Sequence, residues 1–258
     1  MNKVKELFKK KEPALGAWVT IQHPDVVEIM STLPFDWLMF DMEHTPSDIS
    51  TLQTILPALN GTDIVPFTRA PWNDMVAIKR LLDLGFKGLL VPYVNSKEEA
   101  EAVVRACRYP PKGVRGVGPR RATRYGSIDI VEYFNNFEKE DLIIGIQIET
   151  QKALDNIYEI LSVEGIELAF VGPNDLSANL GVFRQFDHPK FQKAIDLVLN
   201  ACDDKGVTPG IFAGGPDAAK KWIEKGFRFV SIAHDYSTLR RAYLNALNDV
   251  REFTRTLR

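Results

Sequence analysis

The sequence has few cysteines and no excess of either charge. Its two cysteines, Cys107 and Cys202, lie far apart and belong to no CxxC pair. A disulfide framework or a thiolate zinc site is therefore not expected, and this cysteine usage fits a reducing, cytoplasmic location. Acidic and basic residues number 34 and 32. Because proteins that bind nucleic acids or membrane surfaces carry a basic excess, neither class of partner is expected.

Long apolar runs are also missing. No window approaches the ~18 apolar residues that a membrane-spanning helix needs. The lysine-rich N-terminal stretch MNKVKELFKKKEPALG has no apolar core of signal-peptide length. Apolar residues nevertheless make up 45% of the chain and charged residues 26%, so a large core can form. We expect a soluble intracellular protein.

The sequence has instead eight short apolar runs, separated by stretches with helical spacing. Nearly continuous apolar runs are typical of parallel strands covered on both faces. The runs are 15–22, 36–44, 63–70, 88–94, 142–149, 168–175, 209–214 and 229–235. Strands and helices alternating in this number predict an α/β protein, a single (β/α)8 barrel domain spanning 1–258. A doubly wound open sheet is the alternative, although no GxGxxG motif follows the first strand.

Capping residues predict where several helices begin. Ser96 and Glu99 have the spacing of a capping box. Other helices are predicted to open with Thr45, which precedes a proline, and with Asn73, ending near Gly85.

One stretch, 109–140, is predicted to be an extended loop because it is too long for a plain connection. It contains the arginines Arg115, Arg120, Arg121 and Arg124 among four glycines. We interpret this segment as an anion-facing loop or a contact between subunits.

Polar residues gather at the carboxyl ends of the predicted strands, where a barrel builds its active site. They are Asp41, Glu43, His44, Arg69, Gln147, Glu149, Asn174 and Asp175. Gln147 and Glu149 are two residues apart and therefore share a face of their strand. Glu149 and Asp175, from adjacent strands, could hold one cation. Two carboxylates completed by water and substrate suit Mg²⁺ or Mn²⁺ better than zinc.

Each polar residue taken alone also has an ordinary structural explanation. Asp175 could begin a helix, and Arg69 could be a surface-loop arginine. His23 and His188 each precede a proline and are interpreted as helix-entry residues, while His234 ends the eighth strand and is ambiguous. The coincidence of several polar strand ends at one rim favours a functional pocket.

Five longer motifs occur in order: FDWLMFDMEH, LLDLGFKGLLVPYV, RYPPKGVRGVGPRRATRYG, IQIET and VEGIELAFVGPNDLSANLG. In these motifs the chain resembles the HpcH/HpaI family of metal-dependent pyruvate aldolases, from Leu15 to the last strand. The resemblance implies a barrel that reversibly cleaves 4-hydroxy-2-oxo acids to pyruvate and an aldehyde. It implies Mg²⁺, Mn²⁺ or Co²⁺ as cofactor. It also implies homo-oligomers built from dimers, up to hexamers, with the eighth helix exchanged between paired subunits.

The resemblance also implies roles for individual residues. Glu149 and Asp175 would bind the metal, Arg69 would contact the pyruvyl oxygens, and His44 would take part in proton transfer. The residues beside the substrate would be Gln147, Gly172, Pro173 and Asn174. The family associates an aspartate matching Asp83 with the histidine. Our interpretation places Asp83 near a helix C-terminus at the other end of its own barrel, from where it would reach a catalytic histidine by an unusual path or from a neighbouring subunit.

The sequence departs from the family pattern at two places near the rim. VGPND has Asn174 where a small residue is expected, and the last strand ends in SIAHD where a glycine more often precedes the aspartate. Because both lie near the rim, these departures bear on which aldehyde the enzyme prefers more than on the cleavage chemistry.

The implied mechanism is proton removal from the 4-hydroxyl through His44, followed by cleavage to an enolate stabilised by the metal and Arg69. No predicted strand end has a lysine, which disfavours the Schiff-base route. Two alternatives stay open. One is a CoA-ester lyase of the citrate lyase β-subunit type, with the arginines of 115–124 near the CoA phosphates. The other is a non-catalytic barrel assembly protein, against which the intact His44, Arg69, Glu149 and Asp175 argue.

Overall fold

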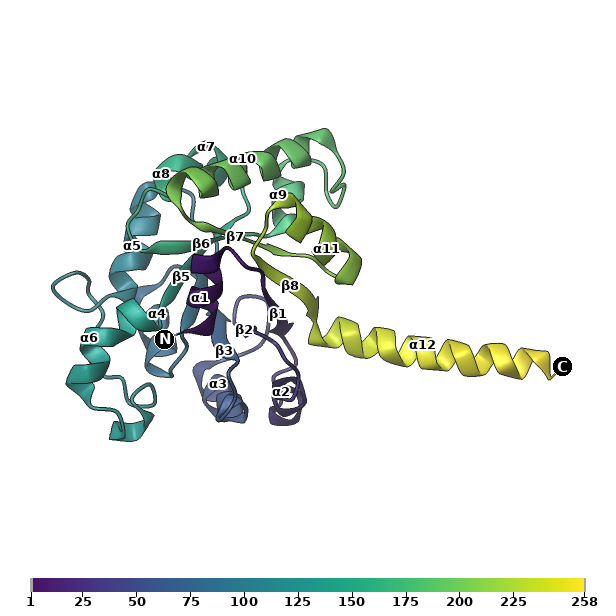
Figure 1. Ribbon diagram of the computed structural model, residues 1–258, viewed down its shortest axis with the longest axis horizontal. Helices are drawn as coiled ribbons and strands as arrows, with labels where there is room; N and C mark the ends of the chain where they lie inside the picture. Colours follow the sequence, from purple (N-terminus) through teal and green to yellow (C-terminus); the bar gives the residue numbers. More distant parts are fainter. Residues whose placement is uncertain (1, 258) are drawn as a thin grey trace.

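Eight parallel strands close into a barrel in the computed structural model, which describes residues 2–257 (Figure 1). The strands are β1 Ala14–Val19, β2 Trp37–Asp41, β3 Val65–Arg69, β4 Gly88–Val91, β5 Ile143–Ile148, β6 Ile166–Val171, β7 Thr208–Phe212 and β8 Phe229–His234. Each strand pairs with the next along the chain, and β8 pairs with β1. The predicted (β/α)8 barrel is confirmed and the open sheet is excluded.

Helices cover the outside of this barrel (Figure 1). The α-helices are α1 Lys3–Lys10, α2 Pro24–Ser31, α3 Ile49–Ile55, α4 Met75–Asp83, α5 Lys97–Cys107, α6 Ile130–Glu140, α7 Gln151–Asp155, α8 Ile157–Ile160, α9 Pro173–Asn179, α10 Pro189–Lys205, α11 Pro216–Lys225 and α12 Asp235–Thr256. Two short 3-10 helices are η1 Leu56–Leu59 and η2 Arg124–Gly126. Within residues 2–257 no helix is both long enough and apolar enough to span a membrane.

All eight strands end before the last residue predicted for them, and two of these differences change the description of the rim. Strand β2 stops at Asp41, so Glu43 and His44 lie in the loop that follows it. Strand β6 stops at Val171 because Pro173 already occupies the first turn of α9. The rim of the barrel is therefore built from strand ends, loops and one helix start.

Two helices begin later than the sequence predicts. Helix α3 begins at Ile49 and is capped by Asp48, not by Thr45. Helix α4 is capped by Asp74, not by Asn73. In both cases an aspartate nearer to the first turn accepts the free backbone N–H, and a carboxylate is also favoured at the positive end of the helix dipole.

Three other helix starts follow the prediction. Ser96 caps α5, and the two histidines before prolines, His23 and His188, cap α2 and α10 by accepting a backbone N–H.

The predicted irregular stretch 109–140 is shorter in the structure. Its last third forms α6, whose first turn is capped by Asp129 through the backbone N–H groups of Val131 and Glu132. Tyr133 and Phe137 of α6 are buried one turn apart. The prediction missed this helix because the arginines and glycines before it dominated the composition of the segment.

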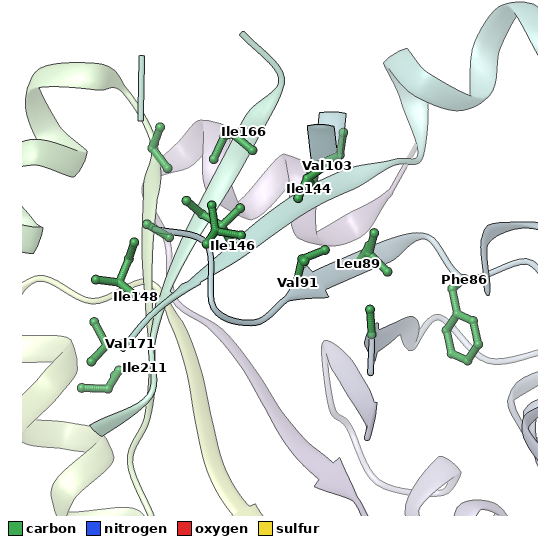
Figure 2. Close-up of a cluster of buried hydrophobic side chains, with 14 of the residues drawn as sticks. Phe86, Leu89, Val91, Val103, Ile144, Ile146, Ile148, Ile166, Val171 and Ile211 are labelled. Atoms are coloured by element: carbon green, nitrogen blue, oxygen red, sulfur yellow. The ribbon is translucent and has the colours of Figure 1, made fainter. Parts of the chain in front are cut away.

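Side chains on the strands alternate between the barrel interior and the layer beneath the helices. On β5, Ile144, Ile146 and Ile148 point outward into the main core, where Figure 2 shows them together. Ile143 belongs to the inner cluster, and Gln147 shares its parity. Each fully buried isoleucine contributes about 2 kcal/mol, which fixes the face that Gln147 presents to the interior.

Aromatic rings fill the amino-terminal half of the barrel. The rings of Trp37 and Phe229 stack at 3.9 Å, and Phe67 lies 5.0 Å from Phe229. Glycines make room for them, because a Cβ on Gly16 would lie 2.2 Å from Trp37 and one on Gly88 would lie 2.0 Å from Phe67. Helix α1 closes this end (Figure 1). The polar side chains singled out in the sequence, Arg69 and Gln147 among them, lie toward the other, carboxyl end.

The last helix leaves the barrel. Figure 1 shows α12 extending away from the other elements, and none of its 22 residues is buried. Its first residue is nevertheless fixed, because the Asp235 carboxylate accepts the N–H groups of Thr20 and Ile21 at 2.7 Å each. The helix has exposed apolar side chains at Leu239, Tyr243, Leu244, Leu247, Val250 and Phe253.

Candidate functional site

A buried arginine lies at the centre of the polar rim. Arg69 ends β3 and is aligned with Asp41, the last residue of β2. Its Nε donates to Asp41 Oδ1 at 2.9 Å and its Nη2 to Oδ2 at 2.8 Å. Burial alone would raise the pKa of Asp41, but the hydrogen bonds and charge of Arg69 outweigh it and lower that pKa. Arg69 keeps N–H groups on Nη1 and Nη2 for another anion.

Glu43 and His44 follow in the loop after β2. Glu43 Oε2 lies 2.9 Å from Arg69 Nη1 and 3.8 Å from His44 Nε2. The Glu43 side chain is 9% exposed, whereas that of His44 is 65% exposed. Burial raises the pKa of Glu43, opposed by the charge of Arg69 and assisted by the charges of Asp41 and Asp175. His44 therefore reaches solvent while the acidic partner beside it does not.

A second buried carboxylate belongs to Glu149, directly after β5. Its Oε1 accepts the Tyr93 N–H at 2.7 Å, and its Oε2 accepts from the Gln147 side-chain amide. Burial raises the pKa of Glu149 to about 6 against these hydrogen bonds, and the nearby charges of Glu43 and Asp175 raise it further. Gln147 and Glu149 do share one face, as predicted.

Helix α9 supplies the remaining predicted residues. Gly172 caps it without a side chain, Pro173 is buried in its first turn, and Asn174 is exposed. Asp175 lies in the same turn and is half-buried. A Cβ on Gly172 would lie 3.1 Å from Gln147 Nε2, within van der Waals crowding distance. The glycine thus keeps space open beside the amide.

The donor set fits a divalent cation held by few protein ligands. Among residues 2–257 no group of three or more His, Cys, Asp or Glu side chains is arranged to hold a metal. The buried Oε1 of Gln147 has no hydrogen-bond partner there, and Glu149 is 1% exposed. An added cation would balance this uncompensated negative charge. Glu149 and Asp175 would supply two hard oxygen ligands to such an ion, and Mg²⁺-type ions commonly take the rest from water and substrate.

Asp83 does not lie at the polar rim. It ends α4, at the amino-terminal end of the barrel, and its Oδ1 accepts from Arg115 Nη2 at 2.7 Å. The Arg115 side chain is fully buried, with its guanidinium carbon 4.5 Å from the Tyr109 ring and 5.2 Å from the Phe137 ring. Arg115 therefore faces a carboxylate of its own chain, and the interpretation of its segment as an anion-facing loop or a contact between subunits stays a prediction. The association of Asp83 with a histidine stays a prediction.

Aromatic residues that sequence reasoning missed border the arginine. The Arg69 Cζ atom lies 4.5 Å above the ring of Trp18, and that ring lies 5.9 Å from Phe170. His234, which the sequence left ambiguous, lies beside them, with its ring centroid 4.3 Å from that of Phe212 and 6.1 Å from that of Trp18. Burial lowers the pKa of His234; the charge of Asp235 opposes this effect and the charge of Arg69 adds to it. The alternation of side chains along the strands was the sequence signal that could have placed Trp18 and Phe170 inside the barrel.

Comparison with known proteins gives one consistent result. The family model described as HpcH/HpaI aldolase/citrate lyase matches residues 14–242. A 5-keto-4-deoxy-D-glucarate aldolase from Shigella boydii is 40% identical over 242 residues, 93% of each chain.

Two solved structures of HpcH/HpaI family proteins have the same fold as this chain. An HpcH/HpaI aldolase/citrate lyase family protein from Burkholderia cenocepacia superposes with a TM-score of 0.92 at 32% identity, covering 97% of this chain and 100% of that one. An HpcH/HpaI aldolase from Desulfitobacterium hafniense gives 0.90 at 28% identity, covering 98% of both chains.

Proposed function

Because the chain belongs to the HpcH/HpaI aldolase/citrate lyase family, we propose that the polar rim at the carboxyl end of its barrel is the active site. The protein is an aldolase, a carbon–carbon lyase that interconverts a 4-hydroxy-2-oxo acid with pyruvate and an aldehyde, in a family that depends on divalent metal. The main support for the site is the burial of Arg69 with Asp41, Glu43 and Glu149 in one barrel mouth.

Glu149 and Asp175 would hold the cation, which we propose to be Mg²⁺, Mn²⁺ or Co²⁺. When bound, it supplies Lewis-acid stabilisation of negative charge on the substrate oxygens. Gln147 lies beside Glu149 and orients that carboxylate through the amide hydrogen bond. Gly172, Pro173 and Asn174 border the substrate, and the space beside Gly172 supports this placement.

Arg69 would bind the anionic oxygens of the 2-oxo acid. Asp41 holds its guanidinium by two hydrogen bonds, so the arginine needs no reorganisation when charge develops on the substrate. Its remaining N–H groups, on Nη1 and Nη2, then stabilise the enolate oxygen and the carboxylate.

His44 would move the proton. Its ring is exposed at the rim, so its Nε2 can take the 4-hydroxyl proton directly or through one water. Loss of that proton breaks the C3–C4 bond, the aldehyde leaves, and the electron pair remains on the pyruvate fragment. Protonation of that fragment at C3 gives pyruvate.

We propose 5-keto-4-deoxy-D-glucarate as the first substrate to assay, because it is the compound in the name of the 40% identical relative. Pyruvate release is followed with lactate dehydrogenase, first with EDTA and then with each metal restored. Lewis-acid stabilisation contributes several kcal/mol, so Glu149→Ala should lose about 100-fold or more in turnover. Glu164→Gln changes an exposed acid and serves as the control.

Two results would contradict this assignment. Turnover that does not respond to EDTA would exclude the metal-dependent mechanism at this site. Full turnover in Glu149→Ala would place the metal elsewhere.

We also propose that the protein is a homo-oligomer in which α12 packs on a second copy. A helix with no buried residue and apolar side chains at three- and four-residue spacing exposes a face that water disfavours. Light scattering should give a mass of at least twice 29.1 kDa. A monomer of wild-type activity would contradict this proposal.

A cytoplasmic location is proposed on separate grounds. Cys107 and Cys202 are both buried free thiols, which a reducing compartment preserves.

A further inference from the structure

We propose that His234 is a specificity-determining residue that hydrogen-bonds a hydroxyl group on the carbon chain of the substrate, in addition to the hydroxyl that reacts. The inference rests on the active site proposed above. It names the substrate class more closely: one of the two fragments, the 2-oxo acid or the aldehyde, carries a hydroxyl group.

A β-bulge turns His234 toward the interior of the barrel. Along β8, Val230 and Ile232 pack outward against the main core, and regular alternation would send His234 the same way. The pairing with β1 shifts by one residue after Gly16, however, so that His234 pairs with Trp18 of the inner cluster. Bulges of this kind redirect side chains beside active sites. His234 therefore shares the inward face of Trp18.

The imidazole lies among aromatic rings with both nitrogens free of protein partners. Its centroid lies 4.3 Å from that of Phe212, 5.2 Å from Tyr236 and 6.1 Å from Trp18. The residue is half-buried, and among residues 2–257 neither ring nitrogen has a hydrogen-bond partner. Two more polar atoms of β1 and β8, Trp18 Nε1 and Ser231 Oγ, are buried without one in the same range. Because an unpaired polar group is costly there, this wall of the barrel mouth favours a ligand that can hydrogen-bond.

This wall borders the group that would hold the charged oxygens of the substrate. Arg69 ends β3 and Glu149 follows β5, one strand to either side of β4. In a closed barrel of eight strands, β8 lies across from β4. The Arg69 guanidinium itself lies over Trp18, the ring beside His234. A carboxylate bound by Arg69 therefore lies next to the wall, and the carbon chain that follows it can reach His234.

The chemistry of His234 suits a neutral hydroxyl better than a second carboxylate. Burial lowers the pKa of His234; the charges of Asp235 and Asp41 oppose this effect and that of Arg69 adds to it. The neutral ring therefore predominates above about pH 6.5, with one N–H donor and one acceptor. A hydroxyl group likewise donates and accepts, whereas a carboxylate only accepts.

Pairs of substrates that differ by one hydroxyl group test the proposal with the metal-loaded full chain in the direction of aldol formation. Pyruvate is compared with 3-hydroxypyruvate against one aldehyde, and acetaldehyde with glycolaldehyde against pyruvate. His234→Phe keeps an aromatic ring and removes both nitrogens. Loss of a neutral hydrogen bond should lower kcat/KM about 2- to 10-fold for the hydroxylated member of one pair, and by less than about twofold for its partner. The affected pair identifies the fragment that carries the hydroxyl.

His234→Gln, which retains a donor and an acceptor, should restore most of the preference. Three results would overturn the proposal. The first is an equal loss for both members of each pair in His234→Phe, and the second is an unchanged kcat/KM for all four compounds. The third is a His234→Gln variant that discriminates no better than His234→Phe, because ring packing rather than hydrogen bonding would then set the preference.

Controls separate these results from other failures. Glu28→Gln, on the exposed face of α2, should leave kcat/KM and melting temperature unchanged. A melting temperature of His234→Phe equal to wild type shows that folding is not the cause; if this variant does not fold, His234→Leu takes its place. A wild-type chain that forms no product from any pair contradicts the proposed function and this inference with it, whereas an active wild type whose variants discriminate equally contradicts only the inference.

Discussion

Replacing Asp83 by asparagine tests whether this aspartate is structural or catalytic. Among residues 2–257, the change removes the one carboxylate hydrogen-bonded to the fully buried Arg115, whose Nε and Nη1 have no hydrogen-bond partner there. Removing one member of a buried pair costs about 3–5 kcal/mol. Because the Asp83 side chain retains 21% exposure, water enters part of the site and we expect about 2–3 kcal/mol.

The assay is thermal unfolding of the metal-loaded protein, followed by circular dichroism, beside turnover at 25 °C. For a chain of this size, 2–3 kcal/mol lowers the melting temperature by roughly 4–12 °C. The double variant Asp83→Leu/Arg115→Met removes both charges and should regain stability to within about 1 kcal/mol of wild type, since apolar replacement of a whole buried pair is often neutral. Asp187→Asn, on the surface, is the control.

One result would refute this reasoning. If Asp83→Asn melts at the wild-type temperature while turnover collapses, the aspartate does not act through Arg115. The catalytic association implied by the family resemblance would then be supported.

Two further predictions follow from the site and the core. Gly172→Ala places a methyl group 3.3 Å from Glu149 Oε2, so the metal concentration for half-maximal turnover should rise while the melting temperature stays within about 2 °C; an unchanged metal requirement would contradict the crowding. Burial raises the pKa of both Cys107 and Cys202 to about 12, which leaves roughly one thiol in 10⁴ ionised at pH 8. Neither thiol should react with Ellman's reagent in the native protein, and both should react in guanidinium; fast native labelling would show that one is accessible.

The polar residues near the strand ends could be predicted from the sequence because their position depends on local pattern. Arg69 and Gln147 follow apolar runs whose parity is visible in the sequence, and the barrel count brings these runs to one rim. The polar rim predicted around them is the one that the structure has. The metal-ligand pair, Glu149 and Asp175, stays a proposal on this geometry.

Other features depended on contacts between distant segments. Pairing of Asp83 with Arg115 joins the end of one helix to a loop 32 residues later, and no local pattern distinguishes this arginine from the others in its segment. The sequence showed Glu43 as a polar residue but not its ion pair with Arg69, because the position of Glu43 depends on a turn against Asp41. The caps of α3 and α4 were misplaced because two candidate residues lay within one turn of each other.

The anchored start of α12 has a consequence for the entropy of the proposed association between two copies. Asp235 ties the first turn of the helix to the Thr20–Ile21 backbone, so its direction is set before anything touches the rest of it. A flexible tail would lose orientational freedom on docking, and that loss weakens binding. A helix whose direction is already fixed where β8 pairs with β1 avoids much of this loss. The two backbone hydrogen bonds of Asp235 thus connect the integrity of the first and last strands to how readily the proposed dimer would assemble.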